Sequence, residues 1–90
     1  MDYSFTPNAW EDYLFWQEND KKTRKKINDL LKDISRNGAC DGLGKPEPLT
    51  GVLKGFYSRR INDKDRLIYK VQDNTISIIA CRYHHFQINR

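Results

Sequence analysis

The stretch KKINDLLKDI at residues 25–34 contains the clearest periodic pattern in the chain. Apolar side chains recur in it at i, i+3, i+4 and i+7: Ile27, Leu30, Leu31 and Ile34. This spacing places them on one face of a helix. Asn19-Asp20 before the stretch and Asn37-Gly38 after it are typical helix boundaries. The pattern therefore predicts an amphipathic helix with one apolar face.

Basic residues surround this apolar face: Lys21, Lys22, Arg24, Lys25, Lys26 and Lys32. One interpretation is a solvated helix face, which is the usual meaning of a charge run. The other is a surface that binds phosphates. The net charge of +4 and the pI of about 9.2 favour a polyanionic partner. They do not choose among RNA, DNA, an acidic protein and an anionic membrane.

The N-terminal part of the chain predicts a short strand and a first helix. Residues 3–5 alternate as a strand does, and Thr6-Pro7 supplies a hydroxyl N-cap followed by proline. Helical spacing gives one stripe, Trp10, Tyr13, Leu14 and Gln17, and puts Glu11, Asp12 and Glu18 on other faces. Phe15 and Trp16 fall partly outside the stripe. They are interpreted as core residues, with an exposed patch for a partner as the alternative.

The C-terminal half predicts an antiparallel meander. Residues 53–61, 67–71 and 75–83 are rich in β-branched and aromatic residues. Asp73-Asn74 between the last two segments suggests a tight hairpin. A strand, two helices and then a meander indicate the α+β class.

Composition indicates one small folded domain over residues 1–90. Hydrophobic residues make up 38% of the chain and charged residues 31%, an ordinary balance for a globular protein. Cys40 and Cys81 do not form a zinc motif and suit a reducing compartment. No signal peptide or membrane span is predicted from the sequence. A cytoplasmic protein is therefore expected.

A loop rich in glycine and proline, residues 38–51, gives the first indication of a site. Pro46 and Pro48 flank Glu47, and prolines restrict their own and the preceding backbone dihedrals. The loop is therefore expected to hold the Glu47 carboxylate in place. Long structured loops in compact domains are more often functional than incidental.

Strand arginines and a histidine give the second indication. Arg59, Arg60, Arg66 and Arg82 lie in strand-like segments and are expected to face an open side of the sheet or a partner. Surface ion pairs are the alternative. By strand alternation, His84 shares a face with Arg82 and His85 points the other way. Taken alone, a histidine at a strand end is more often structural than catalytic.

These residue types match the needs of RNA cleavage without a metal. The RNA supplies its own nucleophile, the 2′-hydroxyl, so a protein must remove that proton and protonate the leaving 5′-oxygen. It must also place positive charge beside the phosphate. A carboxylate, several arginines and a histidine fit this list, although many basic domains contain them.

Five stretches together resemble the YoeB/Txe-type toxins of the RelE/ParE superfamily. They are AWEDYLFWQ at 9–17, KKINDLLKD at 25–33, GKPEPL at 44–49, GFYSRRI at 55–61 and CRYH at 81–84. Each is weak alone, but their order and the length of the chain make the match specific over nearly all of it.

The resemblance implies a RelE-like microbial RNase fold, with one sheet packed on two helices. It implies a toxin of a bacterial type II toxin–antitoxin system, silenced by a YefM/Axe-like antitoxin and compatible with a homodimer. It also implies a ribosome-dependent endoribonuclease that cleaves mRNA in the A site of the 70S ribosome and inhibits translation, with no metal or other cofactor.

The resemblance also assigns roles by matched motif. Glu47 corresponds to the general base, Arg66 to the arginine that stabilises the charged phosphate, and His84 to the general acid. Further residues expected to bind RNA are Arg59, Arg60, Lys45, Arg82, Tyr83 and His85. Those expected to contact ribosomal RNA through phosphates are Lys21, Lys22, Arg24, Lys25 and Lys26.

This chain departs from the family pattern after the histidine. A tyrosine follows there in the family and ends the chain, whereas this chain has His85 and continues through residues 86–90. Two other functions stay open. One is a ParE-like toxin with a protein target, although such relatives lack the Glu/His site. The other is a non-enzymatic module that binds RNA or the ribosome.

Overall fold

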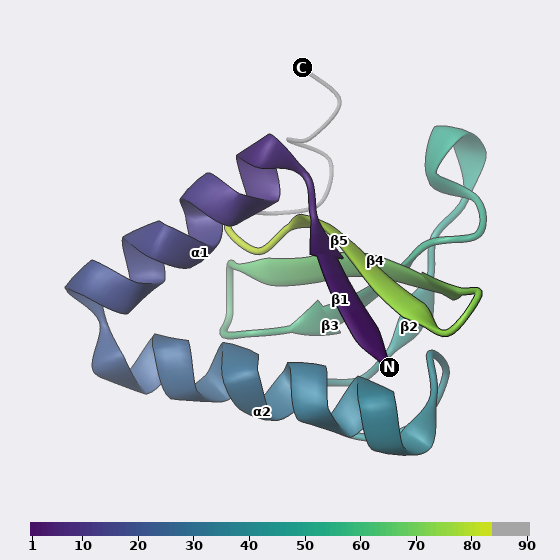
Figure 1. Ribbon diagram of the computed structural model, residues 1–90, viewed down its shortest axis with the longest axis horizontal. Helices are drawn as coiled ribbons and strands as arrows, with labels where there is room; N and C mark the ends of the chain where they lie inside the picture. The colour runs from purple at the N-terminus through teal and green to yellow at the C-terminus, as the bar shows by residue number, and fades with distance from the viewer. Residues whose placement is uncertain (84–90) are drawn as a thin grey trace.

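The computed structural model describes residues 1–83 and shows an α+β architecture (Figure 1). Strand β1 (Asp2–Phe5) comes first, followed by helices α1 (Pro7–Asn19) and α2 (Lys21–Asn37). The next connection contains the two-residue strand β2 (Glu47–Pro48) and a short 3₁₀ helix (Gly51–Leu53). The chain then forms β3 (Tyr57–Arg60), β4 (Arg66–Gln72) and β5 (Thr75–Ala80). The predicted fold class is confirmed.

The strands form one sheet in the order β1-β5-β4-β3-β2. The predicted antiparallel meander is present as β3, β4 and β5. The N-terminal strand pairs parallel with the last one, with Asp2 beside Thr75 and Phe5 beside Ile78. On the other edge, β2 pairs antiparallel with β3. The two edge strands thus come from the start of the chain and from the predicted loop.

Helix α2 supplies one wall of the core, as its periodicity predicts. Its apolar stripe is buried against residues of β4 and β5, including Leu67, Tyr69 and Ile78. The predicted ends are also confirmed: the Asp20 carboxylate accepts from the Thr23 N–H at 3.1 Å, and Gly38 ends the helix with φ of 89°. In Figure 1, α2 runs below the strands and α1 lies to their left. Neither helix is long and apolar enough to cross a membrane.

The stripe predicted for α1 faces the core only in part: Tyr13 packs against the core residues. Trp10 and Leu14 are exposed, whereas Ala9, Asp12 and Trp16 are buried. Trp16 is a core residue, as the favoured interpretation held, and its Nε1 donates to the Cys81 carbonyl at 2.8 Å. The buried face follows i, i+3 and i+7 spacing but includes a carboxylate. Apolar periodicity could not identify it for that reason.

Two strand boundaries also differ from prediction. The segment expected over residues 53–61 becomes a strand only at Tyr57, because the 3₁₀ helix and a turn occupy its first part. The strand expected over residues 75–83 ends at Ala80. There the Cys81 N–H donates to the Asp12 carboxylate at 3.2 Å, and the chain leaves the strand ladder.

Candidate functional site

One face of the sheet carries two of the predicted catalytic residues. Residues directly opposite in antiparallel strands share a face, as do alternate residues within a strand. Glu47 pairs with Ser58, and Ser58 pairs with Ile68. Two positions away, Arg60 pairs with Arg66. We call this side of the sheet the outer face. Its members are Glu47, Ser58, Arg60, Arg66, Ile68 and Lys70, of which Ser58 and Ile68 are buried.

The outer face lies opposite the helices. Leu67 and Tyr69, which alternate with the outer-face residues of β4, belong to the core that α2 covers. The carboxylate of Glu47 and the guanidinium of Arg60 are therefore exposed on the helix-free side. Arg66 is half-buried and lies directly opposite Arg60. The fold thus brings a carboxylate and two arginines onto one surface.

Strand pairing holds Glu47 in place. The Glu47–Pro48 segment pairs with Tyr57 and Ser58 of β3, and the Leu49 N–H donates to the Phe56 carbonyl at 2.9 Å. The sequence predicted a stiff loop here because of its prolines, and the structure adds a short strand. Lys45, two residues earlier, is exposed and has φ of 51°.

Arg59 contradicts the expectation that the strand arginines face an open side. It lies on the helix-facing side of β3 and is fully buried. Its Nη1 donates to the Asp33 carboxylate at 2.6 Å and to the Leu43 carbonyl at 3.0 Å. Its Nη2 donates to the carbonyls of Gly38 and Asp41 at 2.9 and 2.6 Å. Arg59 therefore anchors the loop that leads to Glu47 and is not available to RNA in this structure.

Arg59 is buried because strand alternation turns it toward the helices, where hydrogen-bond acceptors surround its guanidinium. Arg59 and Arg60 are neighbours, so they point to opposite faces of the sheet. A buried guanidinium is tolerated only when its donors are paired. The loop carbonyls, the Tyr69 hydroxyl at 2.8 Å and Asp33 provide those partners. Hydrogen bonds from the Leu43 N–H and then from Arg59 hold the pKa of Asp33 below its ordinary value.

Arg66 is oriented by the turn between β3 and β4. Its Nη1 donates to the carbonyls of Asn62 and Asp65 at 2.8 and 3.1 Å. Within residues 1–83, no acceptor is assigned to its Nε or Nη2, which leaves those donors for an anion. A guanidinium held on one side in this way is suited to bind a phosphate.

The segment after β5 runs from the core to Arg66. The Arg66 N–H donates to the Tyr83 carbonyl at 3.0 Å. Arg82 is half-buried, and its guanidinium lies 3.6 Å from the Phe15 ring centroid and 4.7 Å from that of Tyr83. His84 and His85, the predicted acid and its neighbour, lie outside the described residues.

Sequence reasoning missed three residues around this site. Lys70 lies on the outer face, 5.3 Å from the Phe56 ring centroid, and alternation from Arg66 would have found it. Asp33 and the buried Asp65 gave no local signal, because their partners lie far along the chain. Within residues 1–83 no group of three or more His, Cys, Asp and Glu side chains could hold a metal ion.

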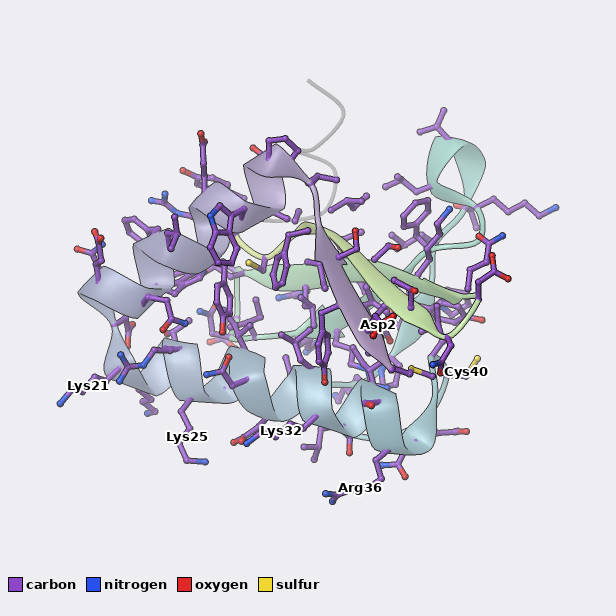
Figure 2. All side chains as sticks on the ribbon, in the orientation of Figure 1. Asp2, Lys21, Lys25, Lys32, Arg36 and Cys40 are labelled. Atoms are coloured by element: carbon purple, nitrogen blue, oxygen red, sulfur yellow. The ribbon has the colours of Figure 1, made fainter. Side chains whose placement is uncertain are left out.

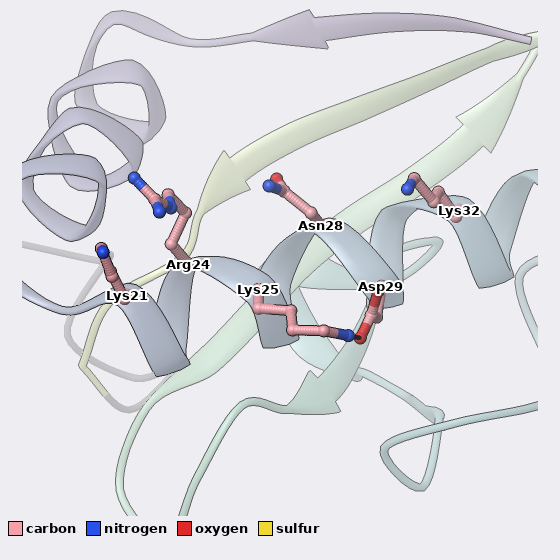
Figure 3. A pocket seen from close by; sticks show the side chains of 6 residues that line it. All are labelled: Lys21, Arg24, Lys25, Asn28, Asp29 and Lys32. Carbon is pink, nitrogen blue, oxygen red and sulfur yellow. Dashed lines mark hydrogen bonds and ion pairs between the residues drawn. The ribbon is translucent and has the colours of Figure 1, made fainter.

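Helix α2 carries a second basic surface, on the opposite side of the sheet from Glu47. Figure 2 shows Lys21, Lys25, Lys32 and Arg36 projecting from the helix toward solvent. A shallow groove of about 470 Å³ lies along the helix (Figure 3). Its lining residues are Lys21, Arg24, Lys25, Asn28, Asp29 and Lys32.

The α2 groove includes only part of the predicted ribosome-binding set. Lys22 and Lys26 do not line it, whereas Lys32, which was not in that set, does. Lys25 forms an exposed ion pair with Asp29 at 2.8 Å, and such pairs add little stability. The groove therefore combines four cations with one carboxylate and keeps a net positive charge.

Comparison with known protein families gives one match over most of the chain. The family described as the YoeB-like toxin of bacterial type II toxin–antitoxin systems matches residues 5–85. Toxin YoeB of Escherichia coli is 51% identical over 85 residues, which are 94% of this chain and 100% of that toxin.

Solved structures give the same result. The toxin in the heterotetrameric YoeB–YefM toxin–antitoxin complex of Staphylococcus aureus superimposes with a TM-score of 0.89 and 57% identity. The match covers 93% of this chain and 97% of that one. The YoeB dimer of Staphylococcus aureus matches with the same TM-score, identity and coverage.

Proposed function

The chain belongs to the YoeB-like toxins of bacterial type II toxin–antitoxin systems, and from this we propose that it is an endoribonuclease. Its proposed substrate is mRNA in the A site of the 70S ribosome, and its effect is inhibition of translation in the cytoplasm. The observation that carries the proposal is the outer face, where Arg66 lies directly opposite Arg60, and Glu47 lies opposite Ser58, two residues from Arg60.

Each residue has a role in the proposed reaction. Glu47 takes the proton from the 2′-hydroxyl, whose oxygen then attacks the adjacent phosphorus. Arg66 stabilises the negative charge that develops on the phosphate oxygens, and Arg60 and Lys70 add positive charge nearby. The bond to the 5′-oxygen breaks as that oxygen receives a proton, in the proposal from His84. The products are a 2′,3′-cyclic phosphate and a free 5′-hydroxyl.

The α2 groove is proposed to contact ribosomal RNA while the outer face holds the message. The two surfaces lie on opposite sides of the sheet, so one chain can touch both at once. Lysine and arginine side chains that meet phosphates give affinity without base specificity. Binding of ribosomal RNA by the α2 groove would place the outer face beside ribosome-bound mRNA, which accounts for the proposed dependence on the ribosome.

Reversing charge in the α2 groove is expected to weaken ribosome binding. We expect the double variant Lys21→Glu/Lys25→Glu to lower affinity for the 70S ribosome about tenfold at low salt, with a smaller effect at high salt. Binding is measured by filtration or fluorescence at several salt concentrations. Lys22→Glu/Lys26→Glu is the comparison variant: it changes the net charge equally on two predicted ribosomal RNA contacts that lie outside the groove, and we expect it to lose less affinity. Equal losses in both variants would contradict a specific role for the groove.

The partners are proposed from the family. The Staphylococcus aureus relative was solved in complex with YefM, and we infer that a YefM/Axe-like antitoxin binds and silences this chain. A YoeB dimer was also solved from that organism, and a homodimer of this chain is proposed on that basis.

The deciding experiment compares one labelled mRNA in two states. The purified chain is incubated with the message free in one reaction and bound to a programmed 70S ribosome in the other, with metal chelated from the free-RNA reaction. Cleavage at the A-site codon only in the ribosomal reaction is expected. Cleavage in both reactions would indicate a free ribonuclease. Ribosome binding without cleavage in either would favour a binding module instead.

A further inference from the structure

The three residues after β5 are held by contacts that replace strand pairing. Cys81 donates its N–H to the Asp12 carboxylate at 3.2 Å, and its carbonyl accepts from Trp16 Nε1 at 2.8 Å. Tyr83 donates its N–H to Asp65 Oδ1 at 2.6 Å, and its carbonyl accepts from the Arg66 N–H at 3.0 Å. The backbone N–H and carbonyl of Cys81 and of Tyr83 are thus hydrogen-bonded outside the sheet ladder.

Asp65, which binds the Tyr83 N–H, directly precedes Arg66 of the proposed site. Its carboxylate belongs to a residue that is only 4% exposed, and within residues 1–83 it forms no ion pair. Besides Tyr83, it accepts from Asn62 Nδ2 at 3.0 Å. The negative charge is therefore stabilised by N–H donors of the chain, at the cost of desolvation. We therefore asked what the buried Asp65 carboxylate holds in place.

The carboxylate binds the backbone of Tyr83, which has an unusual conformation. Its φ is 67°, in the left-handed region that residues with a Cβ rarely adopt. Such conformations persist where surrounding contacts hold them. Asp65 and Arg66, adjacent in sequence, bind the N–H and the carbonyl of this one residue. The conformation of the chain at Tyr83 is thus set by Arg66, the first residue of β4, and by Asp65 just before it.

We propose that Asp65 is a positioning residue, which holds Tyr83, a predicted RNA contact, in its turned conformation beside Arg66. This proposal rests on the proposed function for its catalytic consequence. Asp65 does not touch the RNA. It acts through the backbone of Tyr83 and couples that residue to the β3–β4 turn, which orients Arg66.

Two substitutions separate the hydrogen bond from the charge. Asp65→Ala removes the acceptor for the Tyr83 N–H. Asp65→Asn is isosteric and removes the charge together with the hydrogen bond from Asn62 Nδ2, yet its amide oxygen still accepts from the Tyr83 N–H. Asp63→Ala is the matched control, because Asp63 is exposed in the same turn and its loss changes the net charge equally.

The first readout is hydrogen exchange of the Tyr83 amide, measured by NMR. We expect Asp65→Ala to speed exchange at least about tenfold, and Asp65→Asn to stay within about threefold of the wild type. The second readout is single-turnover cleavage of ribosome-bound mRNA. Asp65→Ala is expected to lower the maximal rate about 10- to 100-fold, with the half-saturating toxin concentration unchanged. Asp65→Asn is expected to recover most of that rate.

Several results would overturn the proposal. Wild-type cleavage by Asp65→Ala would remove the catalytic consequence, and a loss in Asp65→Asn equal to that in Asp65→Ala would assign the effect to charge. A similar loss in Asp63→Ala would make it nonspecific. If Asp65→Ala does not fold, Asp65→Asn still decides, because the proposal requires it to protect the Tyr83 amide and to cleave. If the wild type cuts no message, the proposed function fails, while Tyr83 exchange still supports or overturns the hydrogen-bond arrangement.

Discussion

Glu47→Gln and Arg66→Ala are each expected to lower the cleavage rate of ribosome-bound mRNA by about 10²- to 10⁴-fold. Glutamine keeps the shape of the side chain but cannot take the 2′-hydroxyl proton. Alanine removes the charge that stabilises the phosphate as it becomes more negative. Both positions lie on the outer face, where Glu47 is exposed and Arg66 is half-buried. The loss is therefore expected in the chemical step and not in folding.

The measurement is a single-turnover assay at saturating toxin, together with thermal unfolding of each variant. Glu18→Gln and Arg36→Ala are matched controls, because both residues are exposed on the helices, away from the outer face. The controls should cleave at the wild-type rate. Full activity in Glu47→Gln and Arg66→Ala would contradict the assignment of the outer face as the catalytic surface.

Asp33→Asn is expected to lower the free energy of unfolding by about 3 kcal/mol, because it leaves a buried guanidinium without its counter-charge. The Arg59 side chain is 0% exposed and that of Asp33 is 13% exposed. Asparagine keeps an acceptor but cannot balance the charge of Arg59. Urea unfolding followed by circular dichroism measures the change.

Asp29→Asn provides the control within the same helix. Asp29 also pairs with a cation, Lys25, but this pair is exposed, and its loss should cost less than about 1 kcal/mol. The pKa of Asp33 lies below its ordinary value of 3.8. Its ionised form therefore stabilises the fold above that value, and this stabilisation is lost as pH falls through the lowered pKa. The difference between Asp33→Asn and the wild type should shrink in acid, and equal effects of the two asparagine variants would contradict the argument.

The hydrogen bonds of Arg59 also help to position the loop that carries Glu47. Arg59 binds three carbonyls of residues 38–43, and the Arg60 N–H donates to the Gly44 carbonyl at 2.7 Å. Gly44 has φ of 79°, and a Cβ there would meet Leu30 at 2.9 Å and the Arg60 carbonyl at 3.1 Å. The loop is thus packed directly on β3 and α2. Glu47 is held on the outer face by this packing as well as by the flanking prolines.

The two arginines of β3 show how far a sequence pattern reaches. Arg59 and Arg60 both had the residue type and the strand setting expected of an RNA contact. Only Arg60 reaches the outer face, and Arg59 is a structural residue of the interior. Alternation requires them to differ, but it does not say which of the two is buried. That choice depends on Asp33 and the loop carbonyls, which reach Arg59 only after the chain has folded.

Local features, by contrast, were predictable because their causes lie within a few residues. The apolar spacing of α2, the Thr6 and Asp20 caps, Gly38 at the helix end and the hairpin at Asp73-Asn74 each depend on near neighbours. The motif around Glu47 and the five stretches that resemble the family could likewise be identified from the sequence. The sequence by itself thus determined the α+β class, the order of the elements and the family.

The tertiary structure decided which faces meet. It set the buried face of α1, the parallel pairing of β1 with β5, the burial of Arg59 and the contact between Asp65 and Tyr83. Each depends on partners that are distant along the chain, and the burial of Asp12, Arg59 and Asp65 depends on hydrogen bonds from or to those partners. Periodicity ranks residues by their apolar character, so it cannot locate a carboxylate or guanidinium whose burial is made favourable by distant donors and acceptors.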